Sequence, residues 1–386
     1  MKKNIYIMYA ISFLQGMVFY GPVATLYRQA SGITIFQITL IESVCLALSV
    51  LLELPWGIVA DRIGYRRTMI ICCVMYFVSK IVFWRADSFG WFMLERVMLG
   101  VICAGLSGVD VSVLYLSCAR GESQKVFGIY NNLGNAGLLV AAGVYAVFIG
   151  NDYRLAGELT VFSYAAAALL AFGLGEVKRP QERRSGFTSG LPQLLRETFG
   201  NRRLLLLLVA VALISETHQT ITVFLNQLQY VKAGMSSAEI AAAFTAMTLL
   251  GLTGGLSAKI TQKFGQKRTG LGLFALCSAA CLALALTRNA VVSVTAVLAL
   301  RVGYSIFQPL QTELQNREIT SPDRATALSF NAVLVDTVSI SVSLVFGAVA
   351  QADVSMAMFF GCALCSVGFL LYPLSVNGKL HGSELS

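Results

Sequence analysis

Charged side chains are scarce in this sequence. Asp, Glu, Lys and Arg make up 13% of the 386 residues, whereas 56% are hydrophobic, and the mean hydropathy is +0.71. Soluble proteins carry about 25% charged residues, which they need to cover their surface. The apolar runs are also too long and too regularly repeated to be buried in one core. The composition therefore excludes an ordinary soluble domain and predicts an integral membrane protein.

Motifs of catalysis are also missing. The sequence has no His/Cys/Asp cluster at metal-ligand spacing, no nucleophile–base set and no glycine-rich phosphate loop. The nine cysteines lie almost all in apolar stretches, which argues against disulfides in external loops. Cys362 and Cys365 have CxxC spacing but no nearby His or charge, so we expect neither a metal nor a redox role. We expect no enzyme, no resident cofactor or metal, no ATP-driven pump, and no sensor with a large soluble output domain.

Twelve long apolar segments are present. A helix needs about 20 apolar residues to cross the bilayer core, and continuous runs without alternation predict helices and not a barrel. The segment after Lys2 and Lys3 has no small-residue cleavage site, so we expect a retained first span. The spans are predicted near residues 5–27, 36–59, 68–85, 91–116, 126–149, 157–175, 204–229, 237–258, 268–287, 290–313, 326–350 and 353–374.

One long polar stretch interrupts these segments. Residues 176–203 carry seven Lys or Arg residues and two prolines. We expect a cytoplasmic linker there, between an N-terminal six-helix bundle at residues 1–175 and a C-terminal six-helix bundle at residues 204–386. Leu191, Leu194, Leu195 and Phe199 recur at helical spacing within it, which fits either a short interfacial helix or a solvated linker.

Lys and Arg are distributed unevenly between the two sides of the membrane. Both termini, the linker and the loops on their side hold most of the basic residues, and such loops are cytoplasmic. The net charge of +9 is thereby explained by orientation, and we expect no nucleic-acid partner. We expect a monomer in the lipid bilayer of a bacterial inner membrane, with cytoplasmic termini and a small-molecule substrate. The opposite loops carry only Arg28, Arg85, Arg154, Lys232 and Arg288.

The loop from Gly57 to Arg67 has a recognisable pattern: Gly, three residues, Asp, a basic residue, any residue, Gly and a basic pair. It resembles the hallmark cytoplasmic loop of the major facilitator superfamily, although a generic positive-inside loop is the alternative. A shorter copy, Gly265 to Thr269, follows the second span of the second half. The resemblance implies two pseudo-symmetric six-helix bundles, transport by alternating access, and a latch for the outward-facing state. Its residues are Gly57, Asp61, Arg62, Gly64, Arg66 and Arg67.

Other motifs of that superfamily are partly present. Arg96 and Gly100 are similar to its Arg-x-x-x-Gly motif, which implies proton coupling, although an Arg near an external span end can also snorkel. Gly134, Gly137 and Gly143 enrich the fifth span in small residues that suit close helix packing, but the proline of drug antiporters is missing, so antiport stays open. The stretch from Asn316 to Thr326 resembles a bacterial drug-efflux-like group.

Ionisable residues within the spans are candidates for function, because charge is costly there. Depths estimated at about 1.5 Å per residue place Glu216, Arg301 and Asp336 near the midplane, with His218 two residues after Glu216. With Arg96, they are our proton-coupling candidates; an Arg301–Asp336 pair that only orients helices is the alternative. Glu42 and Lys80 fall in the outer third, where we expect a structural pair.

Polar residues of the predicted cavity-lining spans are candidates for substrate contact. The leading hypothesis is a proton-coupled exporter of a small amphipathic compound or drug, driven by the proton gradient. The alternative is a proton-coupled importer of a sugar, organic anion or other metabolite. Asp110 lies near a cytoplasmic span end, where pairing or gating is equally compatible with its position. The cavity candidates are Gln15, Tyr20, Asp110, Gln219 and Gln308.

Overall fold

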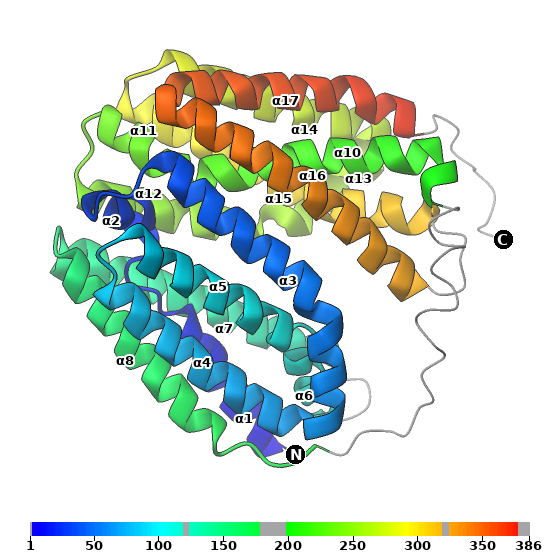
Figure 1. The fold of residues 1–386 in the computed structure, drawn as a ribbon. Helices are drawn as coiled ribbons and strands as arrows, with labels where there is room; N and C mark the ends of the chain where they lie inside the picture. The colour runs from blue at the N-terminus through cyan, green and yellow to red at the C-terminus, as the bar shows by residue number, and fades with distance from the viewer. Residues whose placement is uncertain (1, 119–122, 178–197, 319–323, 377–386) are drawn as a thin grey trace. The chain divides into compact units, whose positions relative to one another are not determined.

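The computed structural model describes residues 2–118, 123–177, 198–318 and 324–376, and these residues form helices joined by short turns (Figure 1). No β-strand occurs among them. In chain order the elements are α1 (Lys2–Gly16), η1 (Gly21–Val23), α2 (Ala24–Ala30), α3 (Ile35–Ile63), α4 (Tyr65–Arg85), α5 (Phe89–Leu106), α6 (Val109–Ser117), α7 (Ser123–Val144), η2 (Tyr145–Ile149), α8 (Tyr153–Ala171), α10 (Arg202–Gln219), η3 (Thr220–Leu225), α11 (Asn226–Lys232), α12 (Ser237–Leu250), η4 (Gly251–Leu256), α13 (Ser257–Phe264), α14 (Gln266–Leu286), α15 (Ala290–Glu318), α16 (Arg324–Ala352) and α17 (Val354–Ser375).

Twelve helical segments in the described ranges are long and apolar enough to cross a membrane. The prediction of an all-α protein with twelve spans is confirmed. Several spans consist of more than one helical piece: the first, Lys2–Ala30, joins α1, η1 and α2, and the seventh, Arg202–Lys232, passes through the π-helical segment η3. The first span extends three residues beyond its predicted end, which carries Arg28 into the span.

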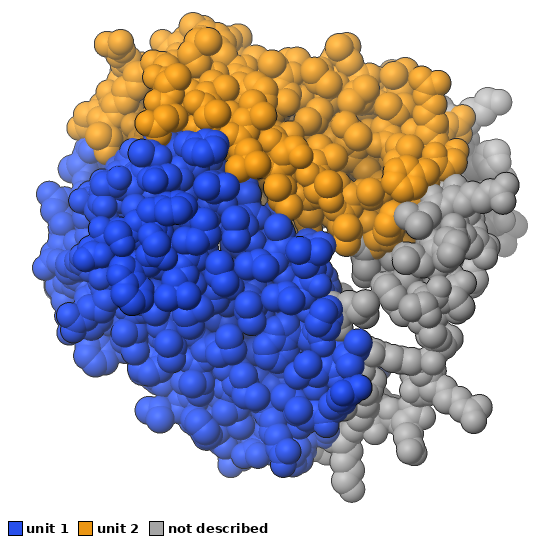
Figure 2. Space-filling model, in the orientation of Figure 1, with its two compact units in different colours: residues 1–182, 235–248 blue, residues 183–234, 249–386 orange. Residues whose placement is uncertain are grey.

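The chain divides into two compact units, coloured separately in Figure 2. Unit 1 comprises residues 1–182 and 235–248, and unit 2 comprises residues 183–234 and 249–386. Within unit 1, Ser237 Oγ at the start of α12 donates to Asn151 Oδ1 at 2.6 Å. The predicted bounds of the two bundles, 1–175 and 204–386, remain a prediction. The expected interfacial helix falls mostly at residues 178–197, outside the described residues.

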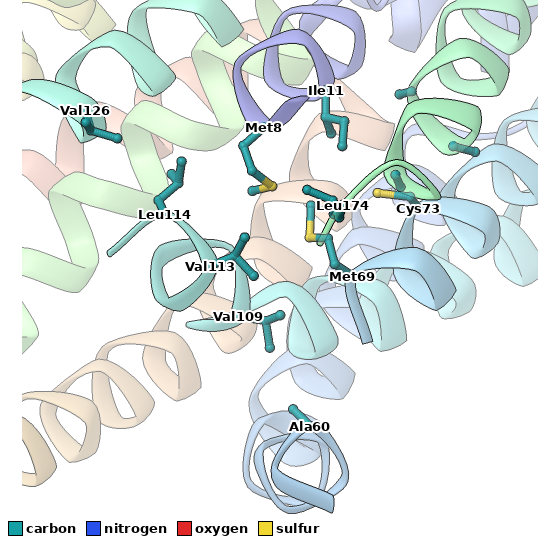
Figure 3. Close-up of a cluster of buried hydrophobic side chains, with 13 residues drawn as sticks. Met8, Ile11, Ala60, Met69, Cys73, Val109, Val113, Leu114, Val126 and Leu174 are labelled. Atoms are coloured by element: carbon teal, nitrogen blue, oxygen red, sulfur yellow. The ribbon is translucent and has the colours of Figure 1, made fainter. Parts of the chain in front are cut away.

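The core of unit 1 is formed by side chains from several helices, shown in Figure 3. Met8 and Ile11 of α1 are fully buried, and Met69 of α4 and Val113 of α6 lie in the same cluster. Burying an aliphatic or Met side chain of this size stabilises a fold by about 1.5–3 kcal/mol when it leaves water. Within a bilayer, close packing and hydrogen bonding carry a larger share, because lipid is itself apolar.

Glycines of α1 and α7 allow the closest helix approach in unit 1. A Cβ added to Gly137 would lie 2.1 Å from the carbonyl oxygen of Phe13, and one added to Gly16 would lie 2.1 Å from that of Gly134. Beside them, Ser12 Oγ donates to the Tyr130 carbonyl oxygen at 2.8 Å. Gly134 and Gly137 of the fifth span therefore pack against the first span, whereas a Cβ added to Gly143 would meet nothing within 4 Å.

Unit 2 packs aromatic rings against glycines. Phe274 and Tyr372 are buried with ring centroids 5.6 Å apart, and added Cβ atoms on Gly270 and Gly368 would collide with these rings. All nine cysteines are free thiols, in agreement with the expected absence of loop disulfides.

Candidate functional sites in the two units

Gly64 joins the second and third spans in a backbone conformation that suits glycine. Its φ and ψ are 92° and 148°, and a positive φ is costly for residues with a Cβ. Its N–H donates to the Ala60 carbonyl oxygen at 3.0 Å, and its own carbonyl oxygen accepts from Thr68 N at 3.1 Å. One residue therefore ends α3 and begins α4, and Gly265 does the same between α13 and α14 with φ 80° and ψ 153°.

Replacing Gly64 by Ala is expected to destabilise unit 1 by about 1–3 kcal/mol, because the added Cβ forces a strained backbone. The substitution tests backbone strain alone, because no atom lies within 4 Å of the added Cβ with which it could collide. The matched control is Gly128→Ala in α7, where space is equally open and φ is not positive. Thermal unfolding of the purified protein in detergent should show a lower midpoint for the first variant. Equal midpoints would refute the interpretation.

Arg66 ties the same loop to the end of the sixth span. Its Nε donates to the Leu174 carbonyl oxygen at 2.5 Å and its Nη2 to that of Phe172 at 3.3 Å, and its Nη1 lies 3.6 Å from Glu176 Oε1. Carbonyls past a helix C-terminus need such donors, since they lack partners in the helix. This contact lies within unit 1.

The loop of unit 2 that repeats this motif, Gly265 to Thr269, is held by different residues, one from α17 and one from α15. Tyr372 Oη of α17 donates to the Gln266 carbonyl oxygen at 3.0 Å, and Arg317 Nη1 donates to Gln266 Oε1 at 3.1 Å. The internal repeat is therefore visible in geometry as well as in sequence. The latch function of Gly57, Asp61, Arg62, Gly64, Arg66 and Arg67 remains a prediction.

Five charged side chains form a chain of ion pairs inside unit 1, which we call the charge cluster. They come from α2 (Arg28), α3 (Glu42), α4 (Lys80) and α5 (Glu95 and Arg96). The pairs are Arg28 Nη1–Glu42 Oε1 at 3.1 Å, Arg96 Nη2–Glu42 Oε1 at 2.9 Å, Arg96 Nε–Glu95 Oε2 at 3.3 Å and Lys80 Nζ–Glu95 Oε1 at 3.6 Å. Arg28 and Glu95 have no exposed surface.

The charge cluster corrects one expectation and extends another. The predicted direct pair of Glu42 with Lys80 is wrong: Glu42 pairs with two arginines, and Lys80 pairs with Glu95. Arg96, singled out by its motif, lies in the middle of the chain of pairs. Arg28 and Glu95 were missed, although Glu95 directly precedes Arg96 in an apolar span, which is the signal that would have identified it.

Aromatic rings surround Lys80. Its Nζ donates to Tyr20 Oη at 3.1 Å and lies 5.2 Å from the ring centroids of both Tyr76 and Tyr164, a range in which cation–π attraction operates. Tyr164 Oη in turn donates to the Gln15 carbonyl oxygen at 2.7 Å. Of the predicted cavity residues, Tyr20 therefore contacts this buried ammonium, whereas the Gln15 side chain donates from Nε2 to Cys73 Sγ at 3.6 Å.

In unit 2, the seventh and tenth spans bring His218 and Arg301 together. Arg301 Nη1 lies 3.3 Å from His218 Nε2, and the His218 ring stacks on Tyr304 with centroids 4.1 Å apart. A guanidinium only donates, so Nε2 must accept, which places the imidazole proton on Nδ1. The geometry favours a neutral His218. Tyr304 was missed; it follows Arg301 by three residues, a spacing that puts both on one helix face.

Glu216 is a buried carboxylate on α10 of the seventh span, with 6% of its surface exposed. Thr220 Oγ1, one turn later, donates to its Oε1 at 2.5 Å. The helix that carries this carboxylate therefore also carries His218, and both side chains are buried. Asp336 lies partly buried on α16, and its predicted pairing with Arg301 remains a prediction.

The remaining cavity candidates are dispersed. Gln219 and Gln308 are exposed on α10 and α15. Asp110 lies in the first turn of α6, where its Oδ1 accepts from Val111 N at 2.7 Å and Tyr130 Oη lies 3.5 Å from its Oδ2. No group of three or more His, Cys, Asp or Glu side chains within the described ranges is placed to hold a metal ion.

A family model described as Major Facilitator Superfamily matches residues 5–344. Among curated proteins, the chain is similar to the quinolone resistance protein NorA of Staphylococcus aureus, at 26% identity over 211 residues. That match covers 50% of this chain and 50% of NorA, so it spans about half the length of the relative. An uncharacterised MFS-type transporter of Methanocaldococcus jannaschii, MJ1560, is 22% identical over 135 residues, 34% of this chain and 35% of that protein.

Solved structures share the fold over nearly the whole chain. The nucleoside transporter NupG superposes with a TM-score of 0.83 at 14% identity, covering 97% of this chain and 100% of NupG. A D-xylose–proton symporter superposes with a TM-score of 0.71 at 12% identity, covering 97% of this chain and 95% of the symporter. At such low identity these likenesses establish the architecture, and the predicted bundle fold is confirmed.

Proposed function

Because this chain belongs to the major facilitator superfamily, we propose that it is a proton-coupled secondary transporter that exports a small amphipathic compound by alternating access. Membership makes it a multi-pass membrane transporter. The coupling ion, the direction and the solute belong to the proposal. No cofactor is required, because the proton gradient supplies the free energy.

The observation that carries proton coupling is the burial of Glu216 in an apolar span. Burial penalises the charged carboxylate, while the Thr220 hydroxyl, which donates at 2.5 Å, stabilises it. Because these two effects oppose each other, a change of environment can decide whether the proton is bound. Alternating access provides that change, since it exposes the seventh span to each aqueous side in turn. On the same span, His218 contacts Arg301, whose Nη1 lies 3.3 Å from its Nε2, so the span carries a second polar site beside the carboxylate site.

Export of an amphipathic compound is supported by the similarity to NorA, a protein named for quinolone resistance. In the interior of unit 1, aromatic rings adjoin the charged Lys80, a combination that suits an amphipathic solute. The alternative, import of a sugar, organic anion or other metabolite, is favoured by one observation: unit 1 holds three cations in its helices, of which Arg28 and Lys80 are buried and Arg96 is partly buried.

Inside-out vesicles test the proposal directly. Vesicles with an acidic lumen are incubated in a medium that contains a panel of fluorescent dyes and metabolites. An exporter that exchanges protons for solute should accumulate its solute in the lumen, and nigericin, which collapses the pH gradient, should abolish the accumulation. Accumulation that survives the loss of both the pH gradient and the membrane potential would refute coupling, and uptake confined to right-side-out vesicles would establish import.

We also propose a monomer in a bacterial inner membrane with both termini in the cytoplasm. The distribution of Lys and Arg supports this orientation. A reporter enzyme that is active only outside the cytoplasm should be inactive when fused after Ser386, and active when fused in the Arg154 loop.

A further inference from the structure

The charge cluster of unit 1 is not electrically balanced. It contains three cations, Arg28, Lys80 and Arg96, and two carboxylates, Glu42 and Glu95. Each carboxylate bridges two cations, so the charges alternate along the chain of pairs and both ends are positive. When every group is ionised, one positive charge remains without a carboxylate of its own.

Such an excess is costly at this depth. An uncompensated buried charge is far less favourable than a paired one, because little water is present to stabilise it. Apart from their ion pairs, buried atoms of both kinds lack hydrogen-bond partners among the described residues, the oxygens Glu42 Oε1, Glu95 Oε1 and Glu95 Oε2 as well as the nitrogens of Arg28. Arg28 has no exposed surface, and its Nε and Nη2 have no hydrogen-bond acceptor among the described residues. The excess positive charge therefore lets the cluster accommodate one more anionic group.

We propose that the charge cluster recognises the anionic group of the transported compound, so that the substrate class is a monoanionic amphiphile such as an aromatic carboxylate. The proposal rests on the proposed transport function and names the solute class for it. A bound carboxylate makes the three cations face three anions. Arg–carboxylate contact is charge-assisted and among the strongest hydrogen bonds in proteins.

Arg96 is the most accessible cation of the cluster. Its side chain is 17% exposed, whereas that of Lys80 is 5% exposed. Its Nη2 and Nε face Glu42 and Glu95, so Nη1 is the guanidinium nitrogen that neither pair uses. An incoming carboxylate meets Arg96 first.

The rings near the cluster suit the body of the same solute. Tyr20 and Phe83 stack with centroids 4.0 Å apart, and Tyr76 and Tyr164 meet edge to face at 5.0 Å. These rings pack against one another, so the cluster lies in an aromatic environment, which matches a planar aromatic anion better than a sugar, which would need more hydrogen-bonding side chains. A cationic solute would have to compete with Lys80 for Glu95.

Three probes that differ only in charge test the class. The full-length protein in lipid nanodiscs is titrated at pH 7 with naphthalene-1-carboxylate, naphthalene-1-carboxamide and 1-naphthylmethylammonium, and binding is followed by calorimetry. The carboxylate should bind about tenfold or more tightly than the neutral amide, as expected for a charge-assisted contact out of water. Tightest binding of the ammonium, or equal binding of all three probes, overturns the proposal.

Charge variants separate recognition by net charge from a purely structural role. Lys80→Gln removes the excess charge and should abolish the carboxylate preference. Lys80→Gln with Glu95→Gln leaves two cations and one carboxylate, which restores the excess, and the preference should return. Lys232→Gln is the control. Lys232 ends α11 in unit 2, where it donates to Ser355 of α17, so the substitution removes a Lys charge outside the charge cluster. A folded double variant that lacks the preference overturns the proposal.

A further variant keeps the test decisive if Lys80→Gln does not fold. Glu42→Gln raises the excess to two positive charges and should strengthen carboxylate binding relative to the amide. Weaker or unchanged relative binding in a folded protein counts against recognition by charge. Because all of these are binding measurements, failure of proton coupling in vesicles leaves them intact, and failure of the carboxylate preference leaves the transport test intact.

Discussion

Transport driven by a pH gradient is expected to stop when Glu216 is replaced by Gln. The amide keeps the size of the side chain and can still accept from Thr220, but it cannot bind and release a proton. In proteoliposomes with an imposed gradient, solute accumulation should fall to the level of empty liposomes. Exchange of solute across the membrane without a gradient should persist, because the change removes coupling and not the solute site.

The control for this prediction is Glu239→Gln. Glu239 lies exposed at the start of α12, where its carboxylate accepts from Ser236 N at 2.7 Å. The Glu239→Gln substitution removes one exposed carboxylate from another span and leaves the buried carboxylates in place. Solute accumulation by this variant should therefore match that of the unchanged protein. Gradient-driven accumulation by a folded Glu216→Gln variant would assign coupling to another group, and Asp336 would be the next to replace.

Span number and the repeat were predictable because few physical requirements determine them. A helix must be about 20 apolar residues long to cross the bilayer core, and twelve such runs can be counted in the sequence. The turn glycines were equally predictable, because the positive φ at Gly64 and Gly265 is readily adopted only by glycine. In these cases the local sequence carries all the information that the local structure needs.

Partners of the buried charges were not predictable in the same way. Depth along a span follows from counting residues, and it placed Glu42 and Lys80 at similar depths. Which residue a side chain meets depends on the rotation of each helix about its axis, which apolar runs do not define when every face is apolar. The structure turns Glu42 toward Arg96 of α5 and Lys80 toward Glu95.

Arg28 was misplaced for a different reason. At the edge of an apolar run, an Arg is compatible with an external loop. In the structure, the break after α1 and the short helix η1, with Pro22, are followed by α2, which carries Arg28 into the buried cluster. The cost of burying a guanidinium is offset only by partners distant in sequence, such as Glu42. A single sequence does not reveal such partners.

Gly137→Ala is expected to disrupt the packing of the first span on the fifth. The added methyl group would lie 2.1 Å from the Phe13 carbonyl oxygen, well inside van der Waals contact, and that oxygen belongs to a helix backbone that cannot rotate away. Overpacking of this kind costs about 1–3 kcal/mol. Since each kcal/mol shifts the unfolding midpoint of a domain of this size by about 2–4 °C, we expect a clear fall in the thermal midpoint in detergent.

Gly143→Ala on the same helix separates packing from helix propensity. Nothing lies within 4 Å of a Cβ added there, so this variant gains the same methyl group without the collision. Ala stabilises a helix interior by about 1 kcal/mol relative to Gly, so its midpoint should stay level or rise. If both variants fall alike, the effect belongs to glycine in α7 generally and not to the α1–α7 contact. If only Gly137→Ala falls, and its transport rate falls with it, close approach of these two helices is needed for transport as well as for folding.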